Sequence, residues 1–80
     1  MRTIIIYAEQ GKGKTRNAER LKEHFGCVGV EDDWRVGEPI IRGTLVLTND
    51  DAVLEMPLPP NADLLRLDAA LSLMEGRPRG

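Results

Sequence analysis

The apolar positions of this chain occur in short runs whose spacing changes from one segment to the next. Ile4, Ile5 and Ile6 form an unbroken β-branched run near the start. A continuous run of this kind is typical of a strand that is buried on both faces of a sheet. We therefore expect a central strand over residues 2–7.

The next apolar positions have the spacing of a helix. Ala18, Leu21 and Phe25 lie three and four residues apart, so on a helix they form one narrow stripe among charged side chains. Gly26 follows, and glycine readily takes the left-handed conformation that ends a helix. The spacing predicts a helix that begins at residue 13 or 14 and ends at Phe25.

Two further apolar runs predict strands over residues 27–31 and 44–48. Between them, residues 34–43 include two glycines and a proline, which favour a long loop. After the second strand, three prolines within residues 57–60 exclude a helix from that region.

The last segment allows two interpretations. Residues 61–74 can form one helix, or a strand over residues 63–67 followed by a helix over residues 69–75. We favour the second because Asp68 is a good N-cap. Gly76 would then end the helix.

Strands that alternate with helices and crossovers predict a small α/β fold, with a mostly parallel sheet of three to four strands and two helices. The 80 residues have room for one domain, which we place over residues 1–76, with a flexible tail over residues 77–80. The carboxyl ends of parallel strands meet at one edge, where open α/β sheets bind ligands. This edge should gather residues 8–15, 32–34 and 48–50.

Residues 8–15 read Ala-Glu-Gln-Gly-Lys-Gly-Lys-Thr and match the phosphate-binding pattern G-x-x-x-x-G-K-[ST], except that Ala8 replaces a glycine. In this pattern the glycines let the backbone approach a phosphate, the lysine supplies charge and the hydroxyl binds magnesium. Glu9 opposes anion binding unless it points away or pairs with a lysine. An inherited loop that no longer holds a nucleotide is therefore an equal alternative. The candidate phosphate-binding residues are Gly11, Lys12, Gly13, Lys14 and Thr15.

Asp32 and Asp33 follow an apolar strand, a position from which an acid can hold the magnesium of a bound phosphate. The candidate metal ligands are Thr15, Asp32 and Asp33, on the condition that a magnesium-nucleotide binds. Alternatively, the two acids only form the turn that ends the strand. Trp34 beside them is either an interface anchor or a plug of the small core under the long loop.

Charged side chains are unevenly distributed although the net charge is only −2. Residues 12–24 carry five bases and two acids, whereas residues 31–63 carry eight acids and two bases. Such a distribution can steer a partner of either sign. The candidate partner-binding residues are Arg16, Arg20, Lys22, Asp32, Asp33, Trp34, Asp50 and Asp51.

Cys27 is the only cysteine and His24 the only histidine, so the sequence offers neither an internal disulfide nor a cluster of His and Cys ligands. No apolar run is long enough to cross a membrane, and no signal segment precedes the first strand. We expect a cytoplasmic protein without membrane association, either a monomer or a homodimer.

Four blocks of the chain together resemble a truncated member of the P-loop NTPase superfamily: residues 4–7, 10–15, 31–34 and 44–49. The resemblance covers roughly residues 2–50 and implies a P-loop-like strand-loop-helix at the N-terminus that binds Mg-ATP or Mg-GTP. Complete members of the superfamily are much longer and carry a separate base-binding region, so hydrolysis is not expected.

In size and overall character the chain is also similar to small accessory proteins of phages and prophages, among which anti-CRISPR proteins are a prominent group. Many of these occupy a surface on a CRISPR effector. This resemblance implies a protein or nucleoprotein partner, with no direct nucleic-acid binding and no required cofactor.

Two functions from different classes follow. The first is a non-enzymatic binding protein on a degenerate P-loop scaffold, which inhibits a host defence complex by blocking a binding surface. The second is a nucleotide-binding protein, either a weak ATPase or GTPase or a kinase-like remnant. The sequence favours the first, because the chain is too short for a complete P-loop NTPase.

Overall fold

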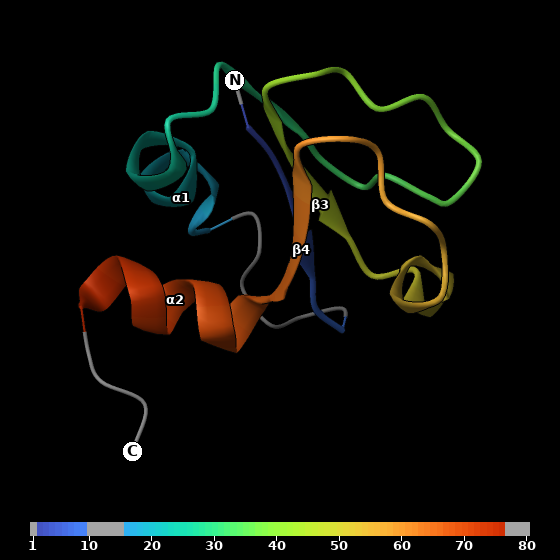
Figure 1. Cartoon of the computed structure of the whole chain (residues 1–80). Helices are drawn as coiled ribbons and strands as arrows, with labels where there is room; N and C mark the ends of the chain where they lie inside the picture. The colour runs from blue at the N-terminus through green and yellow to red at the C-terminus, as the bar shows by residue number, and fades with distance from the viewer. Residues whose placement is uncertain (1, 10–15, 77–80) are drawn as a thin grey trace.

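The computed structural model describes residues 2–9 and 16–76, which form a small α/β fold (Figure 1). Four strands make one parallel sheet in the order β2–β3–β1–β4. The strands are β1 (Thr3–Tyr7), β2 (Gly29–Glu31), β3 (Thr44–Thr48) and β4 (Ala62–Arg66). The helices are α1 (Ala18–Phe25), α2 (Leu67–Glu75) and the short 3₁₀ helix η1 (Asp51–Leu54). The predicted fold class is confirmed, and every strand pair in the described part of the chain is parallel.

The first strand lies inside the sheet, as its apolar run predicts. Ile5 of β1 pairs with Val46 of β3 on one side and with Leu64 of β4 on the other. Ile4, Ile5 and Ile6 are fully buried. A run of three buried residues requires cover on both faces of the sheet, because successive side chains point to opposite faces.

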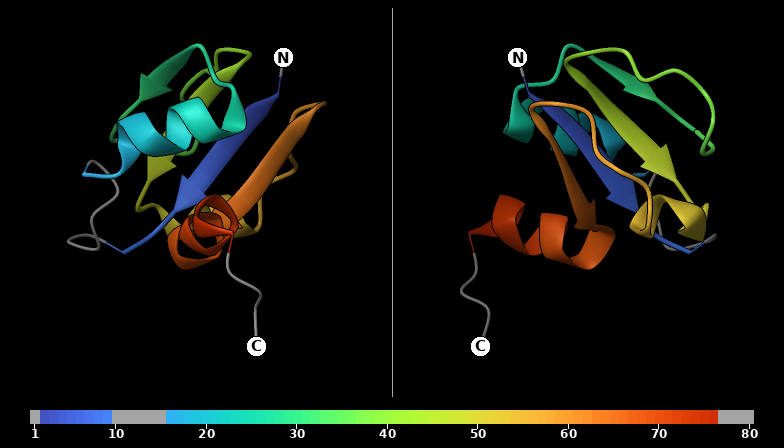
Figure 2. Two further views of the ribbon diagram at one scale, coloured as in Figure 1. Left: turned by 90° about the vertical axis from the view of Figure 1, so that its left-hand side faces the viewer. Right: turned by 45° about the vertical axis from the view of Figure 1, so that its right-hand side comes forward.

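Helices cover one face of the sheet, and loops with η1 cover the other (Figure 2). We call these the helical face and the loop face. On the helical face, alternate residues of β1 and β3 pack with the two helices in a cluster that includes Ile4, Ile6, Leu21, Leu45, Leu47 and Ala70. The other residues of β1 and β3 point to the loop face, where the cluster contains Ile5, Tyr7, Trp34, Val46 and Val53.

The three connections between strands are arranged as one handedness requires. The connection from β1 to β2 crosses the helical face through α1. The connections from β2 to β3 and from β3 to β4 cross the loop face, to which they contribute Trp34 and Val53. The first connection runs toward the β2 edge of the sheet, and the other two run in the opposite direction, toward β4. If all three are right-handed, the first must therefore cross one face and the other two the opposite face.

Both α-helices end at the predicted glycines. Gly26 has φ 70° and Gly76 has φ 72°, which is the left-handed conformation expected after a helix. The predicted start of the first helix is too early, because residues 16–17 form a turn and α1 begins at Ala18. The predicted phosphate loop at residues 10–15 and the predicted tail at residues 77–80 lie outside the described residues.

The strand-then-helix interpretation of the last segment is confirmed, but its boundary is different. β4 ends at Arg66 and α2 begins at Leu67 without a loop. Asp68 therefore lies in the first turn of α2 rather than at its N-cap, and its Oδ1 accepts a hydrogen bond from Ala69 N at 2.9 Å. The short helix η1 was not predicted, because its four residues are too few for a helical period.

The packing of α1 on the sheet predicts unequal costs for two leucines. Leu21 of α1 is fully buried and Leu73 of α2 is 51% exposed. We expect Leu21→Ala to lower the free energy of unfolding by about 2–5 kcal/mol because it leaves a cavity. The control Leu73→Ala should cost less than about 1 kcal/mol. Urea unfolding measures both values, and equal losses would show that α1 does not pack through Leu21.

Candidate functional site

β1 and β3 are neighbouring strands, and the connections that follow them leave the sheet on opposite faces. After β1 the chain continues toward α1 on the helical face, and after β3 it continues toward η1 on the loop face. The two ends are joined by a backbone hydrogen bond from Ala8 N to Thr48 O at 3.1 Å. Ligands of open α/β sheets bind where connections diverge in this way.

The predicted phosphate-binding residues, Gly11, Lys12, Gly13, Lys14 and Thr15, lie outside the described residues. The described residues on either side of them are Glu9, at the end of β1, and Arg16, before α1, and both are exposed. The phosphate-binding motif therefore follows the central strand of the sheet in the chain.

The candidate magnesium ligands Asp32 and Asp33 follow a more distant strand. They come after β2, and β3 lies between β2 and β1. With neighbouring strands about 4.8 Å apart, the end of β2 is about 10 Å from the end of β1. Asp32 Oδ1 accepts a hydrogen bond from Asp33 N at 2.8 Å, and Asp33 has φ 55°. These contacts favour the alternative that the two acids form a turn.

Polar residues near the end of β1 come from β3, and Arg66 of β4 also pairs with Tyr7. Thr48 is fully buried, and its Oγ1 accepts a hydrogen bond from Asp50 N at 3.0 Å. Asn49 follows it and is half-buried. The sequence places residues 8 and 48–50 at the same edge, and the hydrogen bond from Ala8 N to Thr48 O agrees with this expectation.

No metal cluster is present in the described part of the chain. Among residues 2–9 and 16–76, no three side chains of His, Cys, Asp or Glu lie together in a way that could hold a metal ion. Thr15, the remaining candidate ligand, lies outside these residues.

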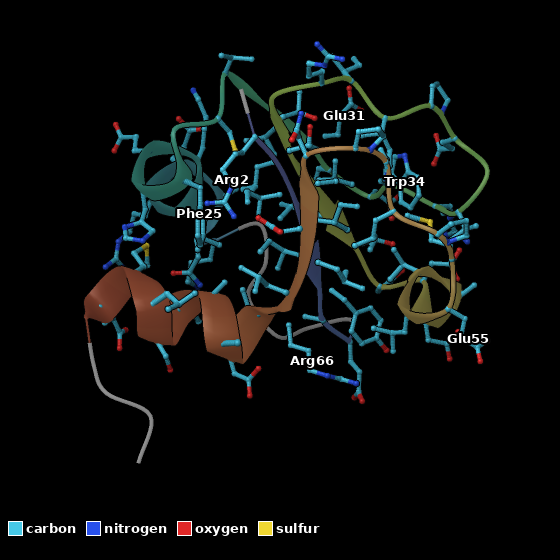
Figure 3. The ribbon with its side chains drawn as sticks, viewed as in Figure 1. Arg2, Phe25, Glu31, Trp34, Glu55 and Arg66 are labelled. Atoms are coloured by element: carbon cyan, nitrogen blue, oxygen red, sulfur yellow. The ribbon has the colours of Figure 1, made fainter. Side chains whose placement is uncertain are left out.

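Trp34 is a core residue, the second of the two predicted alternatives. Its side chain is 3% exposed and lies on the loop face, inside the long loop (Figure 3). Trp34 N donates to Leu47 O at 2.9 Å, and its Nε1 donates to Pro39 O at 3.1 Å. A side chain enclosed in this way offers no surface to a partner, so we remove Trp34 from the partner-binding candidates.

Asp50 links two loops of the loop face. Its Oδ1 accepts a hydrogen bond from Ala52 N at 3.0 Å and caps η1, and its Oδ2 accepts one from Val36 N at 3.1 Å. Asp51 beside it is exposed. Asp50 therefore has a structural role, and of this acidic pair only Asp51 is fully available to a partner.

The basic candidates lie on or before α1. Arg16 and Arg20 are exposed, as a partner-binding role requires. Lys22 is half-buried, and its Nζ lies 3.9 Å from Glu19 Oε1.

A hollow of about 370 Å³ lies beside this site, under the ends of β1 and β4. Its lining residues are Tyr7, Ala8, Glu9, Arg66, Leu67, Asp68 and Leu71. Cζ of Arg66 lies 5.6 Å from the centre of the Tyr7 ring. Figure 3 shows Arg66 beyond the carboxyl end of β4. Sequence reasoning named Ala8, Glu9 and Asp68 for other reasons and did not bring them together, because they come from two segments far apart in the chain.

Cys27 is not part of the site. It is 7% exposed, and burial raises the pKa of its thiol, against the opposing effects of a hydrogen bond with the Ile4 backbone and the charge of Arg2. The thiol is therefore protonated at neutral pH and is a poor nucleophile.

Comparison with known proteins adds no family. Neither a family model, nor a curated protein sequence, nor a solved structure matches this chain. Among the residues that the structure describes, no helix has the length and apolar composition needed to span a bilayer. The function of this protein must therefore be inferred from its fold and from the chemistry of the site.

The two hydrogen bonds of Asp50 predict a stability loss in Asp50→Ala. Loss of the η1 cap and of the bond to Val36 N should lower the free energy of unfolding by about 1–3 kcal/mol. Asp51→Ala is the matched control and should change it by less than about 0.5 kcal/mol. Thermal or urea unfolding of both variants measures the difference. Equal stability of the two variants would contradict the role of Asp50 as a link between loops.

Proposed function

We propose that this protein binds the phosphate groups of a mononucleotide, with its magnesium ion, at the carboxyl end of β1. The observation that carries the proposal is the divergence of the β1 and β3 connections at the point where the Gly-Lys-Gly-Lys-Thr segment follows β1. A ligand-binding position of the fold and a phosphate-binding motif of the sequence thus coincide.

Each residue of the motif has a stated task in this proposal. Gly11 and Gly13 permit close approach of backbone N–H groups to the phosphates, and Lys14 neutralises phosphate charge. The hydroxyl of Thr15 binds the magnesium ion. Asn49, which follows β3, would be a second residue placed to hold the ion. The proposed activity is binding.

Two lysine variants test this proposal. Lys14→Ala removes a charge-assisted contact worth about 1.5–3 kcal/mol, so the Kd for Mg-ATP or Mg-GTP should rise by about ten- to a hundredfold. Lys22→Ala removes the same charge from the far part of α1 and should leave the Kd within about twofold. Calorimetric titration measures both. An unchanged Kd in Lys14→Ala, or equal losses in the two variants, would refute the proposed phosphate site.

A second candidate function is binding to a nucleoprotein complex, such as a CRISPR effector. The observation that favours it is the exposure of charges of both signs, from Arg16 and Arg20 before and on α1 and from Asp32, Asp33 and Asp51 at the ends of β2 and β3. Exposed charges of this kind can compete for a phosphate contact or occupy a basic groove.

The second candidate predicts dose-dependent inhibition of a CRISPR effector nuclease by the purified protein. Reversal of Arg16 and Arg20 to Glu, or of Asp32 and Asp51 to Lys, should relieve the inhibition, because the binding surface would then repel its partner. Circular dichroism would confirm that the variants are folded. Inhibition that persists in both variants would exclude the charge-driven mechanism.

A further inference from the structure

We infer that the hollow under β1 and β4 holds the base of the nucleotide. This inference depends on the proposed function, since it assigns the part of the ligand that extends beyond the phosphates. The hollow is lined by Tyr7, the last residue of β1, and by Ala8 and Glu9, the first two residues of the phosphate-binding motif.

Among residues 2–9 and 16–76, the carboxyl edge of the sheet has an open direction into which the rest of a nucleotide can extend. Toward β3 and β2 the loop face is closed by Trp34, which is buried and bonded to Leu47 O. Asp50 ties the two loops together on that side through Val36 N and Ala52 N. Toward β4 the structure has the hollow of about 370 Å³. A ligand whose phosphates lie at the end of β1 can therefore extend toward β4.

The walls of the hollow are apolar. Tyr7 belongs to the cluster of the loop face, whereas Leu67 belongs to the cluster of the helical face, with Leu71 packed against it. The hollow thus lies at the end of the strands, between the two faces. Its volume is near the lower limit of ligand pockets, which is about 300 Å³. A single heterocycle with its sugar suits this size better than a dinucleotide.

The polar groups at the rim match the edge of a base rather than a phosphate. Arg66, Glu9 and Asp68 are exposed and together give the hollow a net charge of −1. This charge disfavours an anion but not a neutral base. The guanidinium of Arg66, whose Cζ lies 5.6 Å from the centre of the Tyr7 ring, can stack on a base ring. The two carboxylates can accept hydrogen bonds from ring and exocyclic N–H groups.

The experiment compares three ligands: Mg-ATP, Mg-GTP and magnesium tripolyphosphate, which has the phosphates but no base. At least one nucleotide should bind about tenfold more tightly than tripolyphosphate, a gain typical of one stacked base. In NMR titrations, the amides of Leu67 and Leu71 should shift with that nucleotide and not with tripolyphosphate.

Two pairs of variants test whether the higher affinity for the nucleotide arises in the hollow. Leu71→Gln should reduce the affinity for the nucleotide to that for tripolyphosphate, whereas the control Leu73→Gln, on the exposed side of α2, should not. Because Leu71 is half-buried and its loss could unfold α2, Arg66→Ala provides a second test in the exposed rim, with Arg42→Ala as its control. Tripolyphosphate affinity should be unchanged in the two leucine variants, and Arg66→Ala should lower it less than it lowers the affinity for the nucleotide.

The outcomes separate the two proposals. If tripolyphosphate and both nucleotides bind equally well and the amides of α2 do not shift, the base site is refuted while the phosphate site stands. A nucleotide preference that survives both Leu71→Gln and Arg66→Ala also refutes the base site. If none of the three ligands binds, the proposed function itself fails.

Discussion

The parallel pairing of β1 with both β3 and β4 is the constraint on which the rest of the structure depends. β1 lies between two strands, and Ile4, Ile5 and Ile6 point alternately to the two faces of the sheet. Both faces must therefore be covered, and these residues provide apolar surface for both clusters. One face receives α1 and α2. The other receives loops with little regular structure, which are held by Trp34 and by the carboxylate of Asp50.

This arrangement also determines where a ligand can bind. The chain leaves β1 toward the helical face and leaves β3 toward the loop face, so the ends of these two strands are the point of divergence. Trp34 and Asp50 close the edge on the side of β2, whereas the hollow under β4 remains open. The same contacts that stabilise the loop face leave the carboxyl edge open toward β4, which is the direction in which we propose that the base extends from phosphates at β1.

The sequence predicts the individual elements and the parallel sheet, but it does not give the order of the strands. The runs at Ile4 and Leu45 predict β1 and β3 because burial on both faces is visible in a continuous apolar stretch. Gly26 and Gly76 mark the helix ends through their φ angles. Strand order is different, because periodicity reports how a strand is buried and not which strand lies beside it. Asp32, a candidate magnesium ligand, is an example, because the sequence does not show that β3 lies between its strand and β1. The burial of Trp34 and the hollow beside Arg66 likewise arise from residues distant in the chain.

The most direct test of the account replaces Mg²⁺ by paramagnetic Mn²⁺ in a mixture of labelled protein and ATP or GTP. The sheet places Ala8 and Asn49 at the carboxyl edge, and Gly43 and Asn61 at the opposite edge, separated by strands of five residues at about 3.3 Å each. If the phosphates and their metal lie at the carboxyl end of β1, we expect the bound Mn²⁺ to broaden the amide signals of Ala8 and Asn49 and to leave those of Gly43 and Asn61 sharp. Equal broadening at both edges, or none at saturating nucleotide, would contradict it.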